Sequence, residues 1–249
     1  MDRIERSRQK YEKLFKVPVS VSGETDPELM KILRRFIFGE VFYTGSLDDK
    51  LRELITIVSL VVQQALPQLK AHVGAALNLE VPPEEIREAV YQCVPFIGFP
   101  KILNAVETMN EFFREREISL PLEDGGTVKD SERYEKGKKI QFPIYGDEIK
   151  ERMKDLPGEF SEAVPRFLTE FCFGDFYTRK TLEIKTRELL ILCMLVTMGA
   201  EKQLLAHVQG NLRVGNSKET MLAAVVHCLP YIGFPNTLNA LNLIKSIEE

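Results

Sequence analysis

The sequence predicts an all-α protein made of two copies of one helical unit. Apolar residues recur at three- and four-residue intervals in both halves, and no segment sustains the period-two alternation of a half-buried strand. A shift of 135 positions aligns Leu33–Ala105 with Leu168–Ala240 without a gap and gives 30 identities in 73 pairs. Average residue usage gives about 4 by chance. The chain is therefore a tandem duplication.

The elements of the first unit follow from helix-start signals. Asp26 is a good N-cap, Pro27 suits the first helical position, and apolar residues follow at helical spacing. The second segment is apolar on most faces, so we expect it at the centre. In chain order the predicted helices begin at Pro27, at Ser46, near Pro67, at Pro82 and after the turn at Gly98 and Pro100. The second unit repeats this order.

The boundary between the units is predicted near Gly125. A charged helix end runs there into a loop rich in acidic residues and glycine, which indicates a flexible linker. The two domains are then residues 1–124 and 125–249. Tyr11 and Tyr134, each followed by Glu-Lys, indicate equivalent starts, and their spacing predicts about 12 extra residues in the second lead-in.

Composition limits the classes of function. The chain has 249 residues, 44% hydrophobic and 28% charged, which is typical of a soluble globular protein. A net charge of −4 disfavours nucleic-acid binding. The longest apolar runs, Leu54–Val62 and Leu189–Ala200, fall short of the ~18 residues of a membrane span, so we expect buried helices. Without a signal-peptide pattern or a disulfide framework, we expect a cytoplasmic location.

Two of the three histidines, His72 and His207, occupy the same place in both copies. Each lies beside apolar residues of its helix, which suits either a core histidine with satisfied nitrogens or a general acid or base in a dry cleft. Glu53 and Glu188 each lie 19 residues before their histidine, within apolar sequence. A carboxylate there is costly to bury unpaired. It forms either a salt bridge between helices or a Glu–His acid/base pair.

The other chemistry-bearing residues offer less. Cys93 and Cys228 match between the copies but lie in apolar helix ends, where a small buried side chain is the favoured role. No C-x-x-C is present, and one histidine per repeat is too little for zinc. No glycine-rich phosphate loop occurs either. From these absences together we expect neither a metal nor a cofactor. His227 is matched by Gln92 and is interpreted as incidental.

One pattern occurs twice: R-E-L, then Q-L-x-A-H-V, then P-[FY]-I-G-F-P-x-x-L-N-A. It closely resembles the carboxymuconolactone decarboxylase family, whose superfamily includes the alkylhydroperoxidase D (AhpD-like) proteins. The resemblance covers roughly residues 33–113 and 134–247. It implies an AhpD-like helical domain duplicated in tandem, in a family whose domains assemble into rings. It therefore implies a homotrimer that mimics a hexamer.

The resemblance also implies roles for residues. The peroxidase branch uses Glu, C-x-x-C and His, whose places here are Glu53 and His72 or Glu188 and His207, with Ala and Gln where both cysteines belong. The decarboxylase branch has a Glu four residues before the histidine, where this chain has Gln68 and Gln203. Gln can orient a substrate but cannot transfer protons. The remaining predicted substrate contacts are Phe96, Tyr231, Gly98 and Gly233.

Three functions follow as hypotheses. The first is a cofactor-independent acid/base lyase or isomerase, decarboxylase-like, acting on a small organic acid or lactone with Glu53/His72 and Glu188/His207 as catalytic pairs. The second is the peroxidase (peroxiredoxin-type) activity of the superfamily, which the missing cysteines disfavour. The third is a non-catalytic ring-forming binding protein. The Phe96/Tyr231 difference indicates that the two sites are not equivalent.

Overall fold

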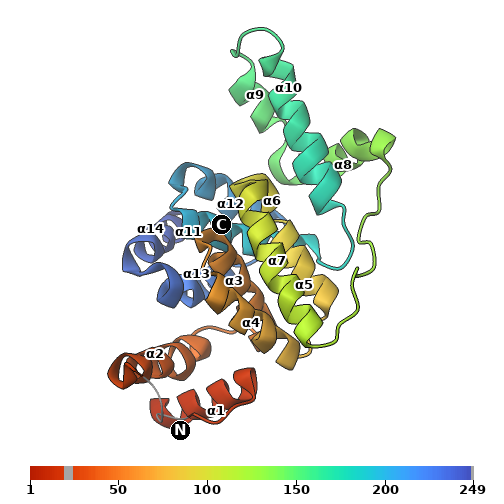
Figure 1. The fold of residues 1–249 in the computed structure, drawn as a ribbon. Coiled ribbons are helices and arrows are strands. Elements are labelled where there is room, and N and C mark those ends of the chain that lie inside the picture. Colours follow the sequence, from red (N-terminus) through yellow and green to blue (C-terminus); the bar gives the residue numbers. More distant parts are fainter. Residues whose placement is uncertain (20–24, 248–249) are drawn as a thin grey trace.

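Every regular element in the described part of the chain is helical, as predicted. The computed structural model describes residues 1–19 and 25–247 (Figure 1). The first repeat consists of α1 (Arg3–Phe15), α2 (Pro27–Gly39), η1 (Val41–Tyr43), α3 (Asp49–Gln63), α4 (Leu66–Asn78), α5 (Pro83–Tyr91), α6 (Val94–Ile97) and α7 (Phe99–Glu115). The second consists of η2 (Asp130–Glu132), α8 (Arg133–Tyr145), α9 (Glu148–Met153), α10 (Phe160–Phe167), η3 (Leu168–Tyr177), α11 (Ile184–Met198), α12 (Glu201–Arg213), α13 (Lys218–Ile232) and α14 (Phe234–Ser246).

Helix starts fall close to the predicted positions, with two differences. Pro27 opens α2, but the Asp26 side chain makes no cap hydrogen bond. The helix expected from Ser46 begins at Asp49, because the Asp48 side chain accepts the Leu51 N–H at 2.8 Å and caps it there.

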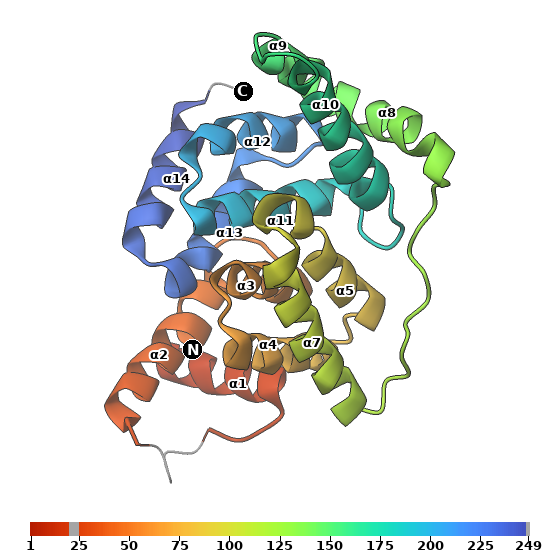
Figure 2. The ribbon, with the colours of Figure 1, turned by 45° about the horizontal axis from the view of Figure 1, so that its top comes forward.

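The centre of the molecule is formed by α3 and α11. These are the two long apolar runs of the sequence, and they pack against each other, with α13 against both (Figure 2). Ile55, Ile57, Leu190 and Leu192 are fully buried there. A single hydrophobic core therefore runs through both repeats. No helix in the described ranges is long and apolar enough to cross a membrane.

Two glycines set the register of the lead-in helices. A Cβ on Gly39 would lie 2.3 Å from the Arg3 carbonyl oxygen, and one on Gly174 would lie 2.6 Å from that of Arg133. Because Gly39 and Gly174 are equivalent, Arg3 corresponds to Arg133, and α1 matches α8 end to end. The sequence-based pairing of Tyr11 with Tyr134 is therefore wrong.

The corrected register changes the size of the insertion. Phe15, the last residue of α1, pairs with Tyr145, the last residue of α8. The distance along the chain from Phe15 to Leu33, where the aligned region begins, is 18 positions. The corresponding distance from Tyr145 to Leu168 is 23 positions. The second repeat therefore carries five extra residues here rather than 12, in the segment that contains α9. The lobe of α9 and α10 projects from the body in Figure 1.

A buried ion cluster ties the repeats together. Glu88 on α5 is fully buried and accepts hydrogen bonds from Arg179 at 2.9 Å and Arg87 at 3.2 Å, and Arg187 lies 3.5 Å away. The predicted flexible linker is held beside it, because the buried Gly125 accepts the Lys180 N–H at 3.0 Å. The described part of the second repeat has no equivalent cluster, because Ala223 stands at the position that corresponds to Glu88.

Candidate active site

The predicted Glu–His pair of the first repeat forms a direct hydrogen bond. Glu53 on α3 and His72 on α4 meet across two packed helices, with Oε2 and Nδ1 2.8 Å apart. The Glu53 side chain is fully buried and His72 is 8% exposed. The second carboxylate oxygen of Glu53, Oε1, is buried and has no hydrogen-bond partner in the described residues. The pair is therefore satisfied on one side only.

The second repeat builds the same pair with a tyrosine between the two members. Tyr145 Oη lies 2.6 Å from Glu188 Oε2 and 2.7 Å from His207 Nδ1. The direct distance from His207 Nδ1 to Glu188 Oε2 is 3.4 Å. Tyr177 donates from its Oη to the other oxygen, Oε1, at 2.6 Å. Both oxygens of Glu188 are therefore hydrogen-bonded.

This geometry assigns the protons. An ionised carboxylate only accepts, so Tyr145 donates its single hydroxyl proton to Glu188. The same Tyr145 oxygen then accepts from the Nδ1–H of His207. The histidine is thereby held with its proton on Nδ1, which leaves Nε2 as the ring nitrogen available to a ligand.

The surroundings keep both tyrosine hydroxyls protonated. Burial, reinforced by the charge of Glu188, raises the pKa of Tyr145 and of Tyr177 well above the ordinary value. Burial also raises the pKa of the Cys172 thiol beside them. The two tyrosines therefore act as hydrogen-bond donors to Glu188, and Cys172 stays a neutral thiol.

Each repeat contributes an aromatic ring to the site of the other. Tyr231 of the second repeat meets the ring of His72 edge to face, with centroids 5.9 Å apart and planes at 88°. Phe96 of the first repeat meets His207 in the same way, at 5.8 Å and 71°. The two sites therefore differ at this position, as predicted, but each aromatic residue contacts the histidine of the opposite repeat.

A cavity of about 210 Å³ opens beside His207. Its walls combine apolar side chains with the Tyr145 and Tyr177 pair, the predicted Gln203 and three residues of α9. The lining residues are Phe96, Gln141, Tyr145, Glu148, Ile149, Arg152, Leu168, Cys172, Phe173, Tyr177, Gln203, Ala206 and His207. Its volume is below the ~300–1,000 Å³ of drug-sized pockets, so it suits a small molecule.

The other predicted contacts lie elsewhere. Gln68 is exposed, one helical turn before His72. Gly98 and Gly233 have φ of 80° and 77° and turn the chain into α7 and α14. Their N–H groups donate to Val94 and Leu229 carbonyls at 2.9 Å. Both amides are therefore engaged in the turns. Among the described residues, no group of three or more His, Cys, Asp or Glu is placed to hold a metal ion.

Sequence reasoning missed Tyr145, Tyr177 and α9. Tyr177 is aligned with Phe42 at the 135-residue shift, so the extra hydroxyl was visible as a Phe-to-Tyr exchange. Tyr145 lies upstream of the gap-free alignment, where the correct register depends on the packing of Gly174 against α8.

Comparisons with known proteins agree with this architecture. The model of the carboxymuconolactone decarboxylase family matches residues 27–111 and again 162–246. A 4-carboxymuconolactone decarboxylase of Acinetobacter baylyi is 23% identical over 120 residues, covering 48% of this chain and 90% of the relative. A nitrosuccinic acid decarboxylase of Metarhizium robertsii is 30% identical over 95 residues, covering 36% and 66%. An uncharacterised 15.0 kDa protein of Paracoccus denitrificans is 37% identical over 82 residues, covering 32% and 61%.

Proposed function

Because the chain belongs to the carboxymuconolactone decarboxylase family, we propose that it is a cofactor-independent decarboxylating lyase. Its substrate is a small organic acid or lactone that binds in the cavity of the second repeat. The observation that carries the proposal is the chain of hydrogen bonds from Glu188 through Tyr145 to His207, whose ring lines that cavity. Two relatives with decarboxylase names support the reaction class.

The arrangement suits a carbanion-type decarboxylation. The bond between the departing carboxylate carbon and its neighbour breaks, CO₂ leaves, and the electron pair moves onto an electron-accepting group of the substrate. For this step His207 is the imidazolium, with a second proton taken up on Nε2 from solvent. It delivers that proton to the carbon, while Tyr145 and Glu188 hold its Nδ1 side and stabilise the positive charge on the ring. In this proposal the amide of Gln203, which lines the same cavity, donates to the developing oxyanion.

The first repeat plays a supporting part in this proposal. Glu53 and His72 are paired, but Phe15 and Phe42 stand where the second repeat has its two tyrosines. In the second repeat the Tyr145 hydroxyl links Glu188 to His207 and fixes the orientation of both side chains. The first pair has no hydroxyl in this position. We therefore assign turnover to Glu188 and His207, with Glu53 and His72 as a structural pair.

Turnover with matched histidine variants tests this proposal. CO₂ release is measured with 4-carboxymuconolactone, nitrosuccinate and a panel of small acids. His207→Gln is expected to lower turnover by about 10²-fold or more, whereas His72→Gln retains it. Equal activity of His207→Gln and the wild type contradicts the mechanism. A non-catalytic binding protein predicts that no acid in the panel is consumed.

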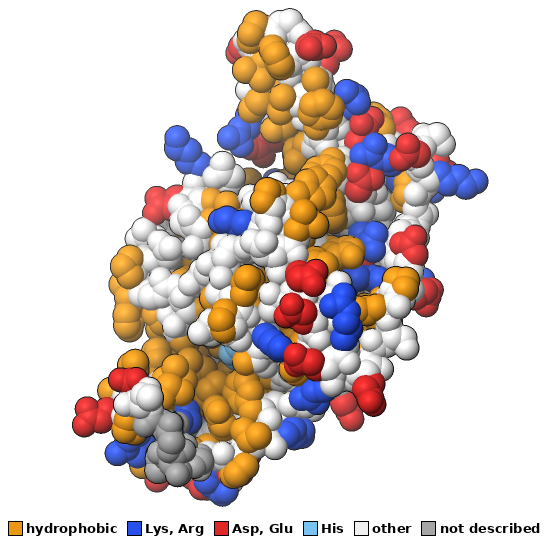
Figure 3. Space-filling view, viewed as in Figure 1, with side chains coloured by type: hydrophobic (Ala, Val, Ile, Leu, Met, Phe, Trp, Pro, Cys, Tyr) orange, Lys and Arg blue, Asp and Glu red, His pale blue; other side chains and the backbone are white. Residues whose placement is uncertain are grey.

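The assembly is proposed to be a homotrimer with six repeats, in which residues 1–124 and 125–249 are the two units. Exposed apolar side chains recur at equivalent positions of both units, and Figure 3 shows one such cluster on the α9–α10 lobe. The equivalent pairs are Leu29 with Val164, Ile32 with Phe167, Phe99 with Phe234 and Leu103 with Leu238. Sedimentation equilibrium tests this, with three times 28.5 kDa expected and a monomer contradicting it.

A further inference from the structure

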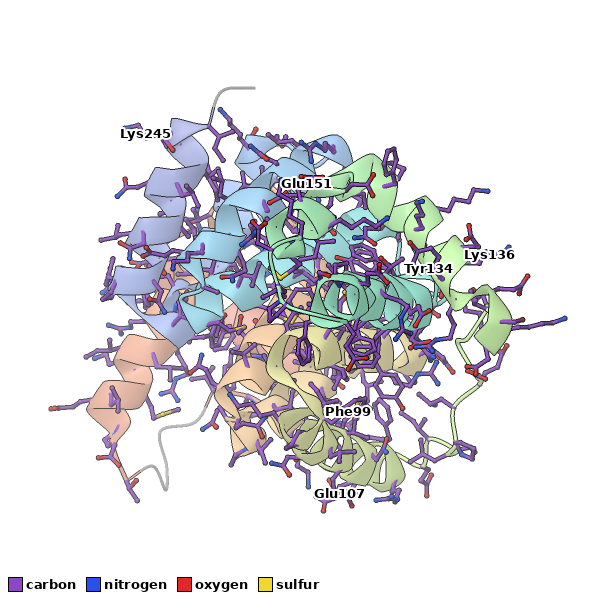
Figure 4. All side chains as sticks on the ribbon, turned by 90° about the horizontal axis from the view of Figure 1, so that it is seen from above. Phe99, Glu107, Tyr134, Lys136, Glu151 and Lys245 are labelled. Atoms are coloured by element: carbon purple, nitrogen blue, oxygen red, sulfur yellow. The ribbon has the colours of Figure 1, made fainter. Side chains whose placement is uncertain are left out.

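The α9 segment forms part of the second site. It lies in the stretch where the second repeat is five residues longer, and it follows directly on Tyr145. Figure 4 marks α9 by Glu151 and α8 by Tyr134 and Lys136, and these two helices lie side by side. α9 therefore forms one wall of the cavity that His207 lines.

Three side chains of α9 reach this cavity: Glu148, Ile149 and Arg152. Arg152 lies four residues after Glu148 and three after Ile149, so its side chain is a neighbour of both on the short helix. Arg152 is the only permanent cation among the residues that line the cavity. The remaining walls are largely apolar, which strengthens the attraction between a cation and an anion at the rim.

The guanidinium of Arg152 is only loosely held. Among the described residues, its one ion pair is with Glu148, one turn earlier, through Nη1 and Oε1 at 3.4 Å. Both side chains are about half exposed, at 51% and 49%. Such a pair contributes little to stability. A ligand carboxylate can displace Glu148 and bind the planar guanidinium through two parallel hydrogen bonds.

We propose that Arg152 anchors a carboxylate of the substrate at the rim of the cavity, and that this is the carboxylate that remains in the product. The inference rests on the proposed function. A cation bound to the departing carboxylate stabilises the ground state and opposes loss of CO₂. The anchored group is therefore a second one, and the preferred substrate is a small diacid with one carboxylate at Arg152 and the other beside His207.

Binding of benzoate and of its uncharged analogue benzamide tests the role of Arg152 without turnover. The apolar walls formed by Phe96, Phe173 and Leu168 accept the ring in both compounds. Titration calorimetry of the full-length protein is expected to show tighter binding of benzoate. Arg152→Gln should weaken benzoate binding by on the order of tenfold, leave benzamide unchanged, and abolish the preference. Glu148→Gln should tighten benzoate binding, because it removes the competing carboxylate.

Lys154→Gln is the matched control. Lys154 lies two residues after Arg152, its side chain is exposed, and it does not line this cavity, so the substitution removes one positive charge without changing the cavity wall. It should bind benzoate like the wild type. The proposal is overturned if the wild type does not prefer benzoate, if Arg152→Gln retains the preference, or if Lys154→Gln loses it equally. His207→Gln should lose turnover but keep the preference. Failure of the anchor and failure of the acid/base chemistry are thereby separated.

Discussion

Tyr145 occupies in the second repeat the place that Phe15 occupies in the first. Each is the last residue of a lead-in helix, and each ring meets the histidine of its repeat, at 5.7 Å for Phe15 and 5.2 Å for Tyr145. The two repeats thus share a ring at this point and differ by one hydroxyl. That hydroxyl joins Glu188 to His207.

Tyr145→Phe is therefore expected to disable the second site without disturbing the fold. The variant gives α8 the residue that already ends α1. It removes the donor to Glu188 and the acceptor for His207 Nδ1–H, so kcat should fall by about 10²-fold with KM little changed. Steady-state kinetics with an acid that the wild type turns over measures this. Tyr11→Phe, which removes a hydroxyl from the first repeat, should retain activity. Unchanged kcat in Tyr145→Phe would count against the relay.

Phe42→Tyr is expected to stabilise the protein. Phe42 is the counterpart of Tyr177, whose hydroxyl donates to Glu188 Oε1. The corresponding oxygen in the first repeat, Glu53 Oε1, is buried and has no hydrogen-bond partner among the described residues. A hydroxyl there should raise the free energy of unfolding by about 1 kcal/mol, because a buried unsatisfied acceptor is costly. Urea unfolding measures the change.

A double-mutant cycle gives this second prediction its control. In the Glu53→Leu background, no side-chain oxygen is left to accept the new hydroxyl, so the gain from Phe42→Tyr should shrink or reverse. An equal effect in both backgrounds means that the hydroxyl does not bond to Glu53.

Most of the fold could be predicted from the helical periodicity of the sequence. The runs that became α3 and α11 are apolar on nearly every face, and that pattern alone predicts buried central helices. The Glu–His spacing of 19 residues also placed the two side chains correctly, because it spans one helix, a tight turn and part of the next. Local patterns of this kind depend on neighbours along the chain.

The rest depends on contacts between distant segments. That Phe96 serves His207 and Tyr231 serves His72 follows from how the repeats pack, which periodicity within one repeat does not record. The position of Tyr145 follows from the close approach of Gly174 to the Arg133 carbonyl. An insertion between α8 and the aligned region hid that register. The α9 wall of the cavity lies outside the gap-free alignment of the repeats, so the repeat offered no template for predicting it.

Hydroperoxide is expected to leave all four thiols free. None of the cysteines forms a disulfide, all four are buried, and burial raises the pKa of Cys93 and Cys172, which keeps both protonated and unreactive. Thiol titration of the unfolded protein before and after stoichiometric hydroperoxide measures this. Loss of two thiols per chain would restore the peroxidase function of the superfamily as a candidate.

The third histidine makes the stability of the fold depend on pH. His227 is fully buried between Arg52, whose Nη1 lies 3.4 Å from Nδ1, and Thr56, whose Oγ1 lies 3.0 Å from Nε2. Burial lowers the pKa of His227 well below its ordinary value, and the charge of Arg52 lowers it further. The residue was expected to be incidental, yet it is a buried base held neutral in the folded state.

His227→Gln tests the consequence, and Gln is the residue that the first repeat carries at this position, Gln92. Below the unfolded-state pKa of about 6.5, the unfolded chain binds a proton that folded His227 does not. The free energy of unfolding should therefore fall with decreasing pH, by up to about 1.4 kcal/mol per pH unit from this group, until the folded pKa is reached. Urea unfolding from pH 7.5 to 5 should show the wild type losing stability relative to His227→Gln. Parallel curves for the two proteins would mean that His227 is protonated equally in both states.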